Sequence, residues 1–325
     1  MELSVVVPLF NEANNIGALY DRIKSTLNTL NLNHEIIFIN DGSSDQTLPL
    51  IIGLSTTDTQ VKYIDFSRNF GHQNAIAAGI EWASGKKIVI MDGDGQDPPE
   101  FIPALYQKSQ EGFEVVYAKR KKRQGEGWLK KFTAKIFYRV LARITNIEIP
   151  VDTGDFRIID QKIQKILAQM PEQQKYIRGQ IAWIGFNQTF LEYDREERMS
   201  GSTKFTYRKM IRFALDGISA FSNWPLKVAT ISGFIVSFIA FLLIIYSLYQ
   251  KFYGYTIVGW TSMQISILFL GGIQLLGIGI LGEYLGRVSE NVKNRPHYII
   301  RDTNLTAQNS NKSTIKTNFN HRNDS

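Results

Sequence analysis

The sequence predicts an α/β protein in which a Rossmann-like parallel sheet is followed by two long apolar helices. Two observations support this prediction. Short runs rich in Val and Ile alternate with helical patterns through about the first 200 residues, as expected for a parallel sheet covered by helices. Two later stretches, residues 226–249 and 259–282, are apolar almost throughout and long enough to cross a hydrocarbon core of about 30 Å.

The N-terminal elements follow one another in a regular order. Continuous apolar runs typical of buried parallel strands lie at residues 3–9, 35–41, 61–67, 86–92 and 114–120. Polar caps or a proline open several of the helical patterns, which lie between the strands at residues 11–30, 43–56, 71–84 and 98–112. Ligands of such sheets bind beyond the carboxyl ends of the strands, so the residues at those ends are the first candidates for a site.

The two apolar stretches predict how the chain lies in a membrane. The link between them is short, whereas basic residues flank their outer ends, which places the large N-terminal part and both termini in the cytoplasm. The expected parts are a domain at 1–200, a juxtamembrane amphipathic helix at 201–223, a first membrane helix at 224–252, an extracytoplasmic loop at 253–258, a second membrane helix at 259–286, and a tail at 287–325 that is basic and then, from about Arg301, disordered.

Composition narrows the possible partners and chemistries. The formal charge of +7 favours a polyanionic partner such as nucleic acid, anionic lipid or a phosphorylated substrate. The absence of cysteine excludes disulfides, thiolate metal sites and thiol nucleophiles.

The end of the fourth expected strand carries the strongest signal for a site. Asp92, Asp94 and Gln96 follow the apolar run IVIM directly, and carboxylates this close repel one another unless a cation lies between them. A calcium loop is excluded because Asp97 and Pro103 stand where that loop has glycine and glutamate. Oxygen ligands on a short loop suit Mg²⁺ or Mn²⁺, with phosphate as a further ligand. Asp97 is expected to cap the helix that follows.

Several sequence blocks resemble a known family. VVVPLFNE, INDGSSDQT, SRNFGHQNAIAAG and MDGDGQDPPE resemble the successive motifs of family 2 glycosyltransferases of the GT-A type. The last block, together with VDTGDFRIID and REERMSGSTKFTYRKM, resembles the polyprenyl-phosphate glycosyltransferases of the dolichol-phosphate-mannose synthase-like branch. The C-terminal helices and basic tail are similar to those of bacterial bactoprenol glucosyltransferases. The resemblance covers residues 1 to about 300.

The resemblance implies a reaction and its partners. The reaction is inverting transfer of a hexose from a nucleotide diphosphate sugar, with UDP-glucose as first choice, to a membrane polyprenyl (undecaprenyl) phosphate for envelope or glycan modification. The implied cofactor is Mg²⁺ or Mn²⁺, and nucleic acid is not a partner. The implied location is the bacterial inner membrane, and the implied assembly is a homo-oligomer, a tetramer.

The resemblance also assigns roles to individual residues. Asp92, Asp94 and Gln96 would hold the cation, and Arg120 would reach the diphosphate. Asp155 stands where the family places a base-like acid, but a lipid phosphate is largely ionised at neutral pH, so orienting the acceptor is the alternative role. The residues implied to line the nucleotide cleft are Pro8, Asn11, Glu12, Asp41 and Asp92.

Two basic amphipathic stretches are expected to meet the lipid acceptor. Residues 128–146 and 203–221 have apolar side chains at helical spacing with Lys and Arg between them, a pattern suited to the headgroup layer. The alternative for each is a core helix whose basic face is solvated. The candidates for holding the acceptor phosphate are Lys131, Arg139, Arg198 and Lys204.

Other functions remain open at this point. The donor could instead be a UDP-N-acetylhexosamine, UDP-aminoarabinose or GDP-mannose, because specificity depends on pocket shape. A processive polysaccharide synthase shares the early blocks, but such synthases usually have more membrane spans. A non-enzymatic module that binds anionic lipid would leave the acidic strand ends unexplained.

Overall fold

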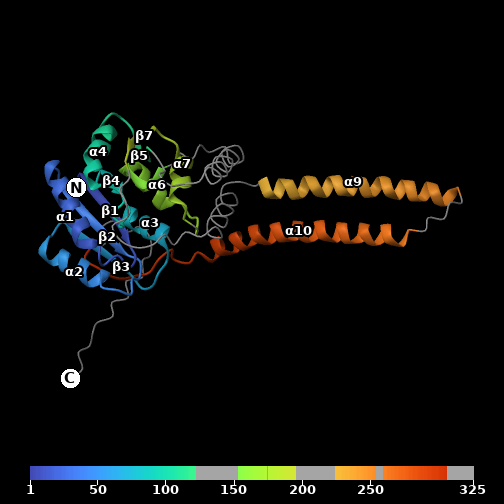
Figure 1. Ribbon diagram of the computed structural model, residues 1–325, viewed down its shortest axis with the longest axis horizontal. Coiled ribbons are helices and arrows are strands. Elements are labelled where there is room, and N and C mark those ends of the chain that lie inside the picture. Colours follow the sequence, from blue (N-terminus) through green and yellow to red (C-terminus); the bar gives the residue numbers. More distant parts are fainter. Residues whose placement is uncertain (122–152, 174, 195–223, 254–258, 306–325) are drawn as a thin grey trace, which may run out of the picture. The chain divides into compact units, whose positions relative to one another are not determined.

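The computed structural model describes residues 1–121, 153–173, 175–194, 224–253 and 259–305 (Figure 1). These residues form an α/β domain and a separate helical unit. Residues 295–305, which follow the helical unit, belong to the α/β domain. The two expected amphipathic helices lie outside the described residues.

The α/β domain is built on a mixed sheet. In the described residues it has eight strands in the order β7-β5-β6-β4-β1-β2-β3-β8. The strands are β1 (Leu3–Leu9), β2 (His34–Asn40), β3 (Val61–Phe66), β4 (Lys87–Ile90), β5 (Val115–Arg120), β6 (Thr153–Asp160), β7 (Gln188–Tyr193) and β8 (Ile300–Thr303). Strands β4, β1, β2 and β3 are mutually parallel, as the sequence predicts for a doubly wound sheet.

The expectation of a parallel sheet is wrong at two strands, β6 and β8. Strand β6 lies between β4 and β5 and is antiparallel to both, while β8 adds an antiparallel strand to the edge at β3. Strand β7 extends the other edge, parallel to β5. Strand β6 lacks a continuous apolar run because Asp155 and Arg157 interrupt it, and these two charges are buried as a pair in the fold.

Helices cover both faces of the sheet (Figure 1). Alternate residues of each central strand point to opposite faces and enter two separate apolar clusters. One cluster joins the sheet to α3 (His72–Trp82), α6 (Gln161–Gln169) and α7 (Ile177–Ile184). The other joins it to α1 (Ile16–Thr29), α2 (Thr47–Thr57) and α4 (Ile102–Gln110), the last preceded by the short helix η1 (Pro99–Phe101).

The helical unit contains two long helices that contact each other, α9 (Trp224–Phe252) and α10 (Trp260–Lys293). Helix α10 extends beyond the expected end at residue 286. Among the described residues, one segment, Phe269–Lys293, passes a test of length and apolar composition for a membrane span. Two membrane spans therefore stay a prediction.

The tail departs from the expectation of disorder from Arg301. Ile300–Thr303 form strand β8, and Tyr298 and Ile300 are buried in the cluster that contains α3. The expectation failed because a short polar strand gains its stability from pairing with β3, which the composition of the tail does not reveal.

Candidate active site

The loop after β4 gathers oxygen-bearing side chains at the carboxyl end of the central strands. Asp94 is buried, and its Oδ1 accepts a hydrogen bond from the Gln96 N–H at 3.1 Å. Gly95 between them has a φ of +74°, which a residue with a side chain adopts only at a cost. The loop therefore turns tightly around the Asp94 carboxylate.

Asp97 stabilises this loop from inside the protein. It is fully buried, and its Oδ1 accepts a hydrogen bond from the Tyr193 hydroxyl of β7 at 2.6 Å. Its Oδ2 lies 3.5 Å from the Asp92 N–H. The expectation that Asp97 caps the next helix is wrong: Pro98 is the N-cap residue of η1, and no side chain caps that helix, because the Asp97 carboxylate turns inward to Tyr193.

Asp155 occupies a buried position on β6 among cationic groups. Its Oδ1 accepts hydrogen bonds from Arg157 Nη2 at 3.0 Å and from Arg178 Nε at 3.2 Å. Its Oδ2 lies 3.2 Å from His72 Nε2 and 3.4 Å from Gln73 Nε2. Both oxygens of the carboxylate are therefore engaged by donors.

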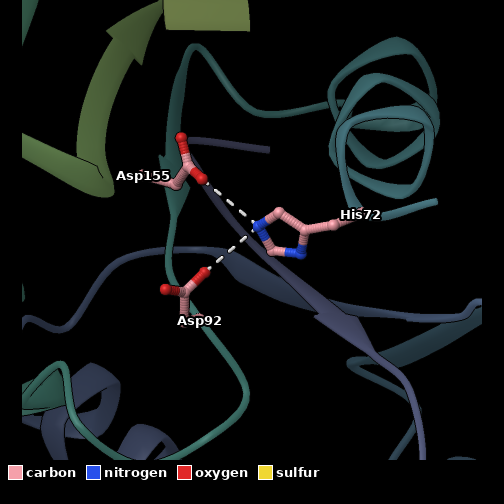
Figure 2. Close-up of side chains that lie close together, drawn as sticks. All are labelled: His72, Asp92 and Asp155. Atoms are coloured by element: carbon pink, nitrogen blue, oxygen red, sulfur yellow. Dashed lines mark hydrogen bonds and ion pairs between the residues drawn. The ribbon is translucent and has the colours of Figure 1, made fainter. Parts of the chain in front are cut away.

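Figure 2 shows that His72 joins the two acidic parts of the site. His72 is the first residue of α3, and its Nε2 lies between Asp155 and Asp92, 3.4 Å from Asp92 Oδ1. The imidazole thus lies between Asp92 and Asp155, and not between Asp92 and Asp94, where the sequence predicts a metal cation.

The charges in this cluster shift the pKa values of its members. Burial would raise the pKa of Asp155, but Arg178, His72 and Arg157 outweigh burial and hold that pKa well below its usual range. Burial would lower the pKa of His72, but its hydrogen bonds to Asp155 and Asp92 and their charges raise it to about 10. His72 is therefore protonated and Asp155 ionised at neutral pH.

The donor set fits a hard divalent cation. Asp92, Asp94 and Gln96 offer carboxylate and amide oxygens within one short loop, and the Asp92 side chain keeps 22% of its surface exposed, so that it remains accessible. Mg²⁺ and Mn²⁺ prefer such oxygen ligands. His72, Asp92 and Asp155 also bring one potential ligand atom each to within 4.8 Å of one another, but the protonated His72 has no free lone pair for a cation, which leaves the β4 loop as the better cation site.

The residues expected in the nucleotide cleft lie at the ends of β1 and β2. Asn11 has a φ of +57°, and its Oδ1 accepts a hydrogen bond from the Ser44 N–H at 2.8 Å. The Glu12 carboxylate accepts one from Asn15 Nδ2 at 2.6 Å. Pro8 is buried within β1, paired with Ile39 of β2. The bond between Asn11 and Ser44 joins the loops after β1 and β2 into one rim.

Asp41 supports the neighbouring loop after β3. It is buried and its carboxylate accepts hydrogen bonds from the Phe70 N–H at 2.7 Å and the Gly71 N–H at 3.1 Å. Burial raises the pKa of Asp41, and these two N–H groups partly offset that rise. Because α3 begins directly after Gly71, Asp41 helps to place His72.

Arg120 lies at the end of β5, beside the same site. A Cβ atom at Gly154 would come within 2.9 Å of Arg120 Nη2, so the guanidinium lies against the backbone of β6. The charge of Arg120 partly offsets the rise in the pKa of Tyr193 that burial and Asp97 cause, so Arg120 lies near the residue that donates to Asp97.

The four candidates for the acceptor phosphate, Lys131, Arg139, Arg198 and Lys204, lie outside the described residues. The structure instead reveals cations that sequence reasoning missed, at His72, Arg157 and Arg178. Arg157 could have been found from the sequence, because an arginine inside a largely apolar strand predicts a buried partner of opposite charge. His72 and Arg178 carried none, since only the tertiary structure brings them to Asp155.

The mixed sheet and the acidic loop at the end of β4 define a GT-A-like α/β domain. The chain belongs to glycosyl transferase family 2, whose model matches residues 4–167.

Similarity to two curated relatives extends over most of the chain. It is 46% identical over 303 residues to an uncharacterised glycosyltransferase of Synechocystis sp., covering 93% of this chain and 95% of that one. It is 41% identical over 302 residues to the bactoprenol glucosyl transferase of Shigella phage SfII, covering 93% and 98% of the two chains. The protein is therefore a glycosyltransferase.

A solved structure is similar to a smaller part of the chain. Glucosyl-3-phosphoglycerate synthase from Mycobacterium tuberculosis, in complex with Mn²⁺, UDP and phosphoglyceric acid, superposes with a TM-score of 0.49 and 20% identity, over 67% of this chain and 76% of that one.

Proposed function

We propose that the protein transfers a hexose, glucose from UDP-glucose, to the phosphate of a membrane polyprenol such as undecaprenyl phosphate, with inversion at the anomeric carbon. The observation that carries the proposal is the juxtaposition of an oxygen-donor loop, Asp92 to Gln96, with a cationic cluster around Asp155 through His72. The similarity to a protein named bactoprenol glucosyl transferase supports glucose and a polyprenyl acceptor.

The residues of the β4 loop would hold the cation. Asp92, Asp94 and Gln96 supply its ligands, and Mg²⁺ or Mn²⁺, when bound, neutralises charge on the diphosphate leaving group. Arg120 donates hydrogen bonds to the same diphosphate, because a guanidinium fits phosphate oxygens in a fork. Asn11 and Glu12 form the rim of the nucleotide cleft. Asp41 contributes to this cleft indirectly, because it holds the loop after β3.

We assign Asp155 an orienting role instead of that of a base. Its two oxygens accept hydrogen bonds from Arg157, Arg178 and His72, and its pKa is held well below its usual range, which makes it a weak proton acceptor. The acceptor phosphate is ionised without help. Asp155 therefore fixes the cations that face the two phosphate-bearing substrates.

The helical unit supplies the membrane anchor of this proposal. Helices α9 and α10 have 29 and 34 residues, each sufficient for a bilayer core of about 30 Å at about 1.5 Å per residue. Large apolar side chains are exposed on both helices, among them Phe234, Phe238, Phe241, Leu275 and Leu285. Two spans with cytoplasmic termini in a bacterial inner membrane would hold the site at the lipid surface. A homo-oligomer remains part of the proposal.

The experiment is sugar transfer by the wild type and Asp94→Asn, with Asp21→Asn as the control. Asp21 is exposed on α1, so its replacement should leave the site intact. Purified protein is incubated with Mg²⁺ or Mn²⁺, undecaprenyl phosphate and labelled UDP-glucose, UDP-N-acetylhexosamines, UDP-aminoarabinose or GDP-mannose. We expect a labelled lipid from UDP-glucose and a loss of at least about a hundredfold in Asp94→Asn, with liposome binding unchanged.

Two results would contradict parts of the proposal. If no donor yielded a labelled lipid with the wild type, the reaction itself would be wrong. If Asp94→Asn transferred sugar as fast as Asp21→Asn, the metal assignment would be wrong while the reaction stood.

A further inference from the structure

The segment that follows α10 closes one edge of the sheet. We call Tyr298–Asn304 the C-terminal strap; it contains β8, which pairs antiparallel with β3. The Asn304 side chain continues the pairing: its Oδ1 accepts from the Tyr63 N–H at 2.9 Å and its Nδ2 donates to the Val61 carbonyl at 3.1 Å. The strap is thus fastened along the length of β3.

The strap holds the C-terminal end of helix α3. The Tyr298 ring stacks on Phe66 with centroids 5.0 Å apart. Its hydroxyl donates to Glu81 Oε2 at 2.7 Å and accepts from Trp82 Nε1 at 3.2 Å. Glu81 and Trp82 form the end of α3, and Tyr298 is buried there.

The strap also holds the loop that precedes α3. We call Ser67–Gly71 the β3–α3 loop. The Ser67 N–H donates to the Ile299 carbonyl at 3.0 Å, and Arg301 Nη2 donates to the Ser67 carbonyl at 2.6 Å. Arg301 Nε also lies 3.7 Å from the buried carboxylate of Asp65, the residue two positions before the loop.

The opposite side of the β3–α3 loop faces the end of β2. Phe70 and Gly71 donate their N–H groups to Asp41. Gly42 has a φ of +66°, and a Cβ atom there would come within 2.4 Å of the Arg68 carbonyl carbon. The loop is therefore confined between the strap on one side and Asp41 and Gly42 on the other.

The position of this loop determines where α3 begins. His72 and Gln73, the first residues of α3, both contact Asp155 Oδ2. A shift of the loop would move both contacts, and displacements of about 1 Å can cost about a hundredfold in rate.

We propose that the C-terminal strap is a positioning element for the donor site and that Arg301 is its positioning residue, acting through the β3–α3 loop. The inference rests on the proposed function, because it concerns the same transfer reaction. Its alternative is that the strap only covers an exposed sheet edge, as edge strands commonly require. In that case Arg301, whose side chain is 59% exposed, would stabilise the fold without affecting the loop.

The test compares Arg301→Ala and Arg301→Lys with Lys108→Ala in the full chain. Lys108 forms an exposed ion pair with Glu111 on α4 and has no described contact with the strap or the loop, so it matches the loss of a surface cation. Three quantities are measured: the melting temperature, hydrogen–deuterium exchange of peptides covering residues 67–74, and kcat and KM for sugar transfer.

We expect Arg301→Ala to speed amide exchange in residues 67–74 about tenfold and to lower kcat/KM about tenfold, since a charged donor to the loop is lost. Its melting temperature should stay close to that of Lys108→Ala. Arg301→Lys keeps one charged donor for the Ser67 carbonyl and should restore most of both quantities.

Two outcomes would overturn the proposal. One is that Arg301→Ala has the same amide exchange at residues 67–74 and the same kcat and KM as Lys108→Ala. The other is that its activity falls only in proportion to a lower melting temperature, with no local change of exchange at residues 67–74. If the wild type made no lipid product from any donor, the proposed function would fail, and the exchange data alone would still decide whether Arg301 holds the loop.

Discussion

Asp155→Asn is the most informative substitution in the site. Asn keeps the shape of Asp155 but removes its charge, so that Arg157 and Arg178, which lie 3.0 Å and 3.2 Å from Oδ1, lose their counter-ion. Arg157 is fully buried, and removing one partner of a buried ion pair costs about 3–5 kcal/mol. For a domain of this size that loss corresponds to a fall in melting temperature of about 6–20 °C.

The assay combines thermal unfolding in detergent with sugar transfer at constant pH. Asp160→Asn is the matched control, because Asp160 lies on the same strand and forms a more exposed pair with Lys87 at 3.2 Å. Asn caps helices as well as Asp does, so the hydrogen bond from the Lys162 N–H to residue 160 should persist. We expect Asp160→Asn to lose no more than about 1 kcal/mol, and Asp155→Asn to lose at least about a hundredfold in transfer rate.

If Asp155→Asn had the same melting temperature and transfer rate as Asp160→Asn, Asp155 would not organise the buried arginines. An orienting role for Asp155 also predicts that the pH–rate profile of the wild type has no limb assignable to Asp155. A limb that disappears in Asp155→Asn would restore the role of a base.

Two further predictions concern stability. Tyr193→Phe removes the donor at 2.6 Å to the buried Asp97 carboxylate and should lower the free energy of unfolding by about 1–3 kcal/mol; equal denaturant midpoints for variant and wild type would show that this bond contributes nothing. Burial would raise the pKa of Asp58, but hydrogen bonds, including that from Lys24, lower it overall, so its stabilisation is present above its unfolded pKa of about 3.9 and is lost as the pH falls through the lower folded value. Asp58→Asn should therefore reduce stability at pH 7, and the difference from the wild type should shrink as the pH falls below about 3.9, which melting curves between about pH 7 and pH 3 can check.

Local sequence patterns were sufficient for the central part of the fold. The strands β1, β2 and β4 contain continuous apolar runs, and a run of that kind predicts a buried parallel strand whatever its neighbours. The acidic loop after β4 was also visible, because its residues are consecutive in the chain. The resemblance to family 2 glycosyltransferases rested on the same local blocks.

Local patterns were misleading wherever a partner is distant in sequence. Asp97 precedes prolines and a helix, which favours a capping role, but Tyr193 draws its carboxylate inward. Ile300–Thr303 lie in a polar tail that composition assigns to disorder, yet β3 offers them an unpaired edge. In both cases the deciding interaction joins residues far apart in the chain.

The sequence by itself determined the family, the parallel core of the sheet and the oxygen ligands at the end of β4, because each depends on residues that are neighbours in the chain. Only the tertiary structure decided that β6 enters the sheet antiparallel, that His72 lies between Asp92 and Asp155, and that Arg301 contacts the β3–α3 loop. Strand order and the meeting of side chains from different elements depend on packing across the whole domain, and hydrophobic periodicity in one segment records which face is buried but not which residues it meets.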